Sequence, residues 1–160
     1  MEEVKGMLGK VNLAFLCAGA AIFVLFVFSL SATPTEPATI EELKARLAST
    51  RPKDRTELCI QIAERQLEAA DKSYSTDEPE KARTALDDVA SFAEQARDSS
   101  IQSRKRQKQT EIAVRRMVRK LFDIKRAVNH EEQVPVQAAI DRLQRVRDDL
   151  LAAMFPKERK

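Results

Sequence analysis

The residues of this chain that could take part in catalysis are few and lie far apart in the sequence. Its single histidine, His130, stands beside two acids and has no cysteine or second histidine nearby that would complete a metal site. The acids Glu64, Glu68 and Asp71 share one face of a predicted helix, but the Glu-x-x-His spacing of di-iron bundles is missing. We therefore expect no catalytic residue, no metal and no cofactor, and we expect His130 to be exposed in a loop.

Glycine-rich loops that bind phosphate are excluded by composition. The chain has three glycines, and none of them follows Gly19. Such loops need glycine because the backbone must approach the phosphate closely. An enzyme that uses nucleotides through such a loop is therefore not expected.

Charge is distributed unevenly along the chain. Acids outnumber bases between residues 53 and 98, whereas bases dominate residues 104–126. The basic residues that we expect to contact an anionic partner are Arg104, Lys105, Arg106, Lys108, Arg115, Arg116, Arg119 and Lys120. Three interpretations stay open: a solvated face balanced by neighbouring helices, a surface for an acidic protein or a second copy, or a surface for an anionic polymer or anionic lipids. Nucleic acid is disfavoured because Phe122 is the only aromatic residue in this segment.

Residues 11–32 carry no charge and are mostly apolar. A helix of this length spans about 30 Å, the thickness of the hydrocarbon core of a bilayer, so we expect a single transmembrane helix. A cleaved signal peptide is the alternative, because small residues near the end of the segment form a plausible cleavage site. Lys5 and Lys10 precede the segment, and the next basic residue is Lys44, so the N-terminus is expected in the cytoplasm and the remainder outside it. Cleavage would make the protein secreted or periplasmic.

The prolines predict how the chain is divided into segments, because they mark the boundaries between helices where glycine is absent. Residues 1–10 form a short cytoplasmic N-terminus, 33–51 a proline-containing linker and a short helix, 52–155 a helical bundle and 156–160 a basic tail. The short helix should begin with a capping box at Thr39 and Glu42. Cys59 has no partner within the bundle, so we expect it to be buried on a helix face.

Apolar stripes predict the helices of the bundle. One helix runs from Pro52 to about Tyr74 and a last one from Pro135 to about Met154. Between them we expect a continuous helix over 79–129, about 75 Å long, because no glycine or proline interrupts it. A break near Ser99 and Ser100, which would give a compact bundle, is the alternative.

The expected fold class is therefore all-α. An N-terminal transmembrane helix, or a signal peptide, precedes an elongated antiparallel bundle or coiled coil of about three main helices with one long central helix. The stripes Ile112–Val128 and Val136–Met154 are expected to pair as its rear hairpin.

The front of the bundle contains a helical pair that resembles a tetratricopeptide repeat. Ala70, Asp77 in the turn, Ala82 and Leu86 carry the resemblance, and Asp77 is also expected to cap the helix that begins at Pro79. The resemblance covers one helical pair, lacks the turn glycine and implies a single-hairpin adaptor.

From the residues themselves we expect a membrane-anchored, extracytoplasmic helical module for protein–protein interaction or structural support, and not an enzyme. The partner is another protein or a second copy of the chain. A charge-driven binder of an anionic polymer or membrane surface through residues 104–126 is the alternative.

Overall fold

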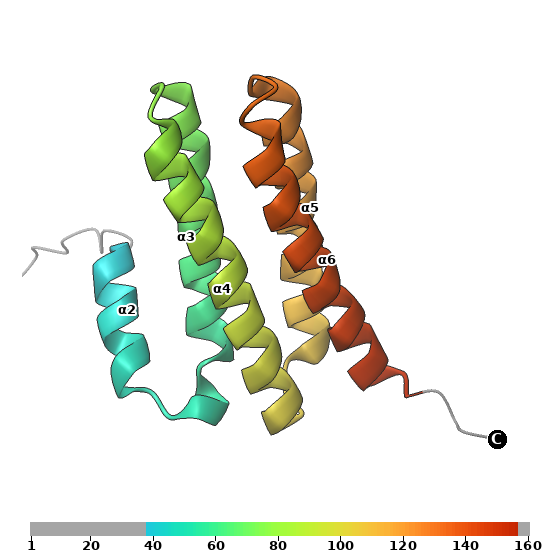
Figure 1. Cartoon of the computed structure of the whole chain (residues 1–160). Helices are drawn as coiled ribbons and strands as arrows, with labels where there is room; N and C mark the ends of the chain where they lie inside the picture. Colours follow the sequence, from blue (N-terminus) through green and yellow to red (C-terminus); the bar gives the residue numbers. More distant parts are fainter. Residues whose placement is uncertain (1–37, 157–160) are drawn as a thin grey trace, which may run out of the picture. The chain divides into compact units, whose positions relative to one another are not determined.

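The computed structural model describes residues 38–156, which form five α-helices and no strand (Figure 1). The elements are α2 (Ile40–Ser49), the 3₁₀ turn η2 (Pro52–Asp54), α3 (Thr56–Ser75), α4 (Pro79–Ser103), α5 (Gln107–Ala127) and α6 (Gln133–Met154). The all-α prediction is confirmed for these residues. The predicted segment 11–32 lies outside them, and no helix that the structure describes is both long and apolar enough to cross a membrane.

The first described helix begins as its sequence predicts. The Thr39 hydroxyl accepts a hydrogen bond from the Glu42 amide at 3.2 Å, and the Glu42 carboxylate accepts one from the Thr39 amide at 3.0 Å. This reciprocal capping box satisfies two amides that a helix start leaves free. Pro52 starts the turn η2 rather than the long helix, so α3 begins a few residues later than its proline suggested.

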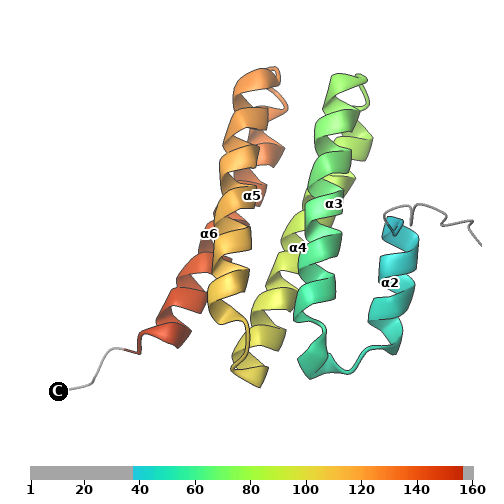
Figure 2. The ribbon, with the colours of Figure 1, turned by 180° about the vertical axis from the view of Figure 1, so that it is seen from behind.

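Two antiparallel hairpins make up the bundle. α3 pairs with α4, and α5 pairs with α6, which confirms the predicted rear hairpin. Figures 1 and 2 show both hairpin turns at one end of the bundle and the connection between α4 and α5 at the other. As a result α3 runs parallel to α5, and α4 runs parallel to α6.

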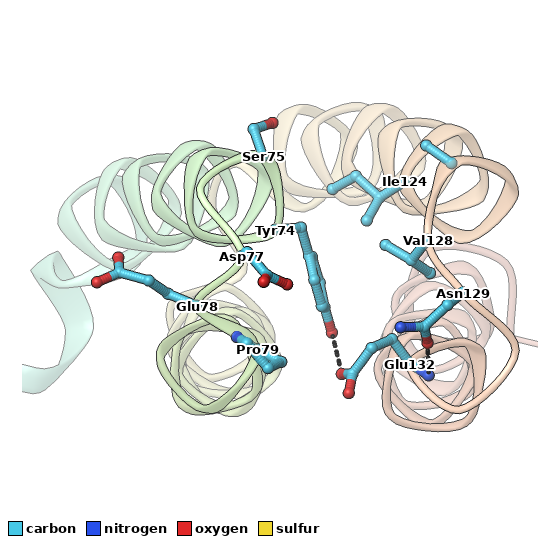
Figure 3. A pocket seen from close by; sticks show the side chains of 10 residues that line it. Tyr74, Ser75, Asp77, Glu78, Pro79, Ile124, Val128, Asn129 and Glu132 are labelled. Carbon is cyan, nitrogen blue, oxygen red and sulfur yellow. Dashed lines mark hydrogen bonds between the residues drawn. The ribbon is translucent and has the colours of Figure 1, made fainter.

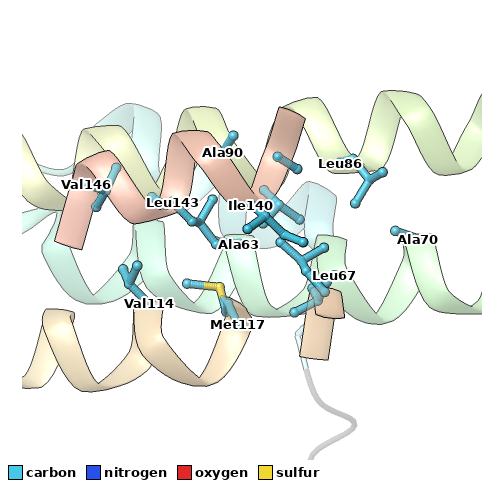
Figure 4. Close-up of a cluster of buried hydrophobic side chains, with 14 of the residues drawn as sticks. Ala63, Leu67, Ala70, Leu86, Ala90, Val114, Met117, Ile140, Leu143 and Val146 are labelled. Carbon is cyan, nitrogen blue, oxygen red and sulfur yellow. The ribbon is translucent and has the colours of Figure 1, made fainter. Parts of the chain in front are cut away.

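Small and large side chains occupy different parts of the core. α3 and α4 make the most extensive contact between helices, and their small buried side chains let the two backbones approach closely: Ala63, Ala70, Ala85 and Ala93. Larger side chains from all four helices fill the space between the hairpins, among them Leu67, Leu86, Met117, Ile140 and Leu143 (Figure 4). Close packing of this kind leaves little room for added volume.

A second, smaller cluster holds α2 against the front hairpin. Leu43 and Leu47 of α2 pack with Ile62, Ala96 and Cys59. Cys59 is fully buried, as predicted, and burial raises the pKa of its thiol to about 11.

The continuous helix over 79–129 is a wrong prediction. α4 ends at Ser103, and Arg104 (φ 54°) and Arg106 (φ 59°) adopt the left-handed conformation. The Arg104 amide donates to the Ile101 carbonyl and the Lys105 amide to the Ser100 carbonyl, which is the Schellman motif that ends many helices. Glycine usually occupies the left-handed position, and a side chain there costs about 1–2 kcal/mol.

The alternative prediction, a break near Ser99 and Ser100, places the break a few residues too early. Both serines are buried inside α4, which ends only at Ser103. The Ser99 hydroxyl accepts from Thr56 at 2.9 Å and donates to the Pro52 carbonyl at 2.7 Å. These bonds fasten the end of α4 to η2 and the start of α3. The bundle consequently has four main helices rather than the predicted three.

The predicted capping role of Asp77 is corrected as well. Asp77 (φ 58°) takes the left-handed position after α3, where its amide donates to the Tyr74 carbonyl and the Glu78 amide donates to the Ser73 carbonyl. It ends α3 instead of capping α4, whose start has no side-chain cap. α3 and α4 nevertheless form one hairpin in which Ala70, Ala82 and Leu86 are buried.

Enlarging a side chain in the close contact between α3 and α4 should separate the two helices. We expect Ala93→Leu to lower the free energy of unfolding by about 1–3 kcal/mol, because Ala93 has no exposed surface and its surroundings are filled. Chemical denaturation followed by circular dichroism measures this. Ala153→Leu adds the same atoms at an exposed position of α6 and should change stability by less than about 0.5 kcal/mol. Equal effects from the two variants would contradict the packing described.

Candidate functional site

Part of the predicted basic surface is neutralised within the bundle. Acids of α3 spaced seven residues apart face two bases of the parallel helix α5 and the arginine just before it. The pairs are Arg106–Glu57 at 3.1 Å, Arg116–Glu64 at 3.2 Å and Lys120–Asp71 at 2.7 Å. Exposed pairs of this kind contribute about 0–1 kcal/mol each, so they orient the hairpins more than they stabilise them.

Buried Glu111 engages two further bases. Its carboxylate accepts a hydrogen bond from Arg147 of α6 at 2.9 Å, and Arg115 lies 3.6 Å from its other oxygen. The shorter contact makes Arg147 the principal partner. The guanidinium of Arg115 therefore remains half-exposed, beside the carboxylate rather than enclosed with it.

The other predicted contact residues have no acidic partner within residues 38–156. Arg104 and Lys105 lie at the joint between α4 and α5, and Lys108 and Arg119 lie on α5. All four are exposed. The structure thus divides the predicted set into bases that pair with α3, bases that face solvent, and Arg115, which lies beside Glu111 on α5 itself.

Of these solvent-facing bases, Lys108 and Arg119 belong to a regular stripe that we call the outer α5 face. Alternating steps of four and three residues keep its members on one side of the helix: Lys108, Ile112, Arg115, Arg119, Phe122 and Arg126. The stripe is about 27 Å long. The opposite side of α5 is buried in the core through Val114, Met117 and Leu121.

The sequence-based prediction of contact residues did not include the two apolar residues of the outer α5 face. Ile112 is 36% exposed and Phe122 39% exposed. The sequence placed Ile112 at the start of the apolar stripe of the core, but the helix turns it outward. Their spacing could have predicted the exposure of both residues. They fall in the same alternating steps of four and three residues as the exposed bases of α5, whereas the buried residues Val114, Met117 and Leu121 follow a separate series.

The acids and the histidine considered for catalysis are placed apart from one another. Glu64 and Asp71 pair with α5, whereas Glu68 pairs with Arg65 on its own helix. His130 is exposed in the turn before α6, as predicted. Across the part of the chain that the structure describes, no group of histidines, cysteines and acids is placed to hold a metal ion.

A cavity of about 240 Å³ opens between the two hairpin turns (Figure 3). Asp77, Glu78 and Pro79 line it from the front turn, and Val128 and Asn129 line it from the rear turn. Tyr74 stands between the hairpins with its hydroxyl directed at Glu132. The cavity therefore lies where the two hairpins meet.

Glu132 forms a clamp across this end of the bundle. Its side chain is 7% exposed and accepts hydrogen bonds from Arg83 of α4 at 2.5 and 3.1 Å and from the Tyr74 hydroxyl at 3.3 Å. The Glu132 amide donates to the side chain of Asn129 at 3.0 Å, which fixes the turn that carries it. Two charged hydrogen bonds in a fork make the pair with Arg83 geometrically specific.

The clamp shifts the proton affinities of its members. Hydrogen bonding from Arg83 holds the pKa of Glu132 below its usual range. Burial, with Glu132 nearby, raises the pKa of Tyr74 to about 12. At neutral pH the carboxylate is charged and the phenol neutral, so neither group is prepared to exchange a proton. The arrangement ties the two hairpins together through a charged carboxylate.

Loss of the clamp should appear in the pH dependence of stability. Because the pKa of Glu132 is lowered by folding, its contribution is present above its unfolded pKa of about 4.3 and is lost as pH falls through the folded value. We expect Glu132→Gln to reduce the free energy of unfolding at pH 7 by about 1–3 kcal/mol. The difference from wild type should shrink as pH falls below about 4, because the unfolded chain takes up a proton at this position before the folded chain does.

Denaturant titrations at a series of pH values measure both effects. Glu131→Gln removes an exposed neighbouring charge and serves as the control. A constant difference between Glu132→Gln and wild type down to low pH would show that the charged form of Glu132 does not support the fold.

Comparisons of this chain with protein-family models, with curated proteins and with solved structures found no match.

Proposed function

We propose that this chain is a membrane-anchored, extracytoplasmic helical module that binds another protein through the outer α5 face, and that it is not an enzyme. The observation that carries the proposal is the exposure of Ile112 and Phe122 among bases, on a helix whose other side is buried. A second helix that packs along this side of α5 would cover both apolar side chains. The anchor and its orientation rest on the apolar segment 11–32 and on Lys5 and Lys10 before it.

The chemistry of the stripe favours an acidic amphipathic helix as the partner. A 4–3 repeat on one helix matches the line along which a second helix packs. Apolar residues of the partner would contact Ile112 and Phe122, which lie about 15 Å apart along the axis. Its acids would pair with Lys108, Arg115 and Arg119, which gives the contact its selectivity.

Site-specific photo-crosslinking in cells tests the protein-binding proposal on the full-length chain. A photoreactive residue at position 119 should yield a covalent adduct with a protein of defined mass, whereas one at Gln95, exposed on α4, should not. Ile112→Ala combined with Phe122→Ala should reduce the adduct about tenfold or more, because removing two anchor side chains costs about 1–2 kcal/mol each. Equal adducts from positions 119 and 95, or no adduct from position 119, would contradict the proposal.

The second candidate function is charge-driven binding to an anionic polymer or an anionic membrane surface. It is favoured by the exposure of Arg104, Lys105, Lys108 and Arg119, which have no acidic partner in the described part of the chain. Binding of this kind depends on counterion release rather than on apolar contact. The two functions therefore differ in their dependence on salt.

Retention on immobilised heparin separates the two functions. Charge-driven binding should weaken steeply between about 50 and 200 mM salt and be lost in Arg104→Gln/Lys105→Gln/Lys108→Gln. It should be unaffected by Ile112→Ala/Phe122→Ala. Failure of the wild-type chain to bind at low salt would remove this second function and leave the first in place.

A further inference from the structure

The joint between α4 and α5 is made of residues that favour a helix over a turn. Arg104 and Arg106 have positive φ values of 54° and 59°, and only Lys105 separates them. Residues other than glycine are strained in this conformation, because their Cβ atom lies too close to the following carbonyl oxygen. Arginine and lysine are good helix formers, and no glycine or proline lies between Pro79 and Pro135. Local preference along this segment therefore opposes the turn.

The turn is held in place by contacts elsewhere in the bundle. Apolar side chains of the rear hairpin, including Met117 and Leu143, are buried against the front hairpin. Arg106 pairs with Glu57 at 3.1 Å beside the joint itself. If the joint straightened within one molecule, these apolar side chains would enter water, so a lone chain remains bent.

A second copy removes this obstacle. Its front hairpin offers the same apolar surface and the same acids, so each contact between the hairpins can be remade between two chains. These contacts include Arg116–Glu64, Lys120–Asp71, Arg142–Glu94 and Arg83–Glu132. Exchange of identical elements adds few new contacts but relieves the strain at both joints, and short strained connections favour it.

We propose that two copies of this chain exchange their α5–α6 hairpins, with α4 and α5 joined into one continuous helix through Arg104–Arg106. The joint lies at the opposite end of the bundle from the clamp of Tyr74, Arg83 and Glu132, as Figure 2 shows for the two ends. It is the single covalent link between the hairpins, so straightening it frees the rear hairpin as a unit. None of the exchanged contacts named above involves a residue of the outer α5 face, so this exchange and the proposed function are independent.

A matched pair of joint variants tests the exchange. Arg104→Gly/Arg106→Gly relieves the left-handed strain and weakens a continuous helix, so the chain should remain monomeric. Arg104→Ala/Arg106→Ala removes the same charges but keeps the strain and favours the helix. After refolding of the full-length chain in detergent, sedimentation equilibrium should give a dimer dissociation constant about tenfold or more lower for the alanine pair. Equal association of the two variants would overturn the proposal.

Cross-linking identifies the exchanged contact directly. Chains carrying Glu64→Cys and chains carrying Arg116→Cys, both with Cys17→Ser, are unfolded together, refolded and treated with a short bis-maleimide. Cys59 is fully buried and should not react in the folded chain. Exchange predicts covalent heterodimers, because Glu64 of one copy meets Arg116 of the other. Dimers that do not cross-link, together with cross-linking inside the single-chain double variant, would show that the hairpins stay with their own chain.

Discussion

The packing of the α3–α4 hairpin against the α5–α6 hairpin is the contact on which the rest of this structure depends. Neither hairpin encloses a core by itself, since Leu67, Leu86, Met117 and Ile140 come from four different helices and bury one another. A helix hairpin needs a second layer to cover its apolar side. Because this contact fixes which side of α5 is buried, it also fixes which side remains exposed.

The same contact determines how charge is used. α3 and α5 run parallel, so the α3 acids Glu57, Glu64 and Asp71 meet bases on α5 or, for Glu57, at Arg106 just before it. What looked like one basic segment in the sequence is two surfaces with different roles. One surface sets the alignment of the hairpins, and the other faces solvent with Ile112 and Phe122 between its bases.

Much of the fold could be predicted because its signals are local. The capping box at Thr39, the burial of Cys59 and the pairing of the last two helices follow from short-range patterns. The turn at Arg104 could not be predicted, because an arginine occupies a position where glycine is usual and long-range packing maintains it. The clamp at Glu132 was missed since its partners, Tyr74 and Arg83, are distant in sequence.

The way in which α2 is attached has a mechanical consequence. α2 is held to the rest of the bundle by Leu43, Leu47 and the contact of Lys44 with Asp88 at 2.9 Å, a much smaller contact than the one between the hairpins. Tension entering from the N-terminal side of Ala38 reaches this helix before any other described element. α2 would therefore detach first and lengthen the chain under tension, while the two hairpins remain folded.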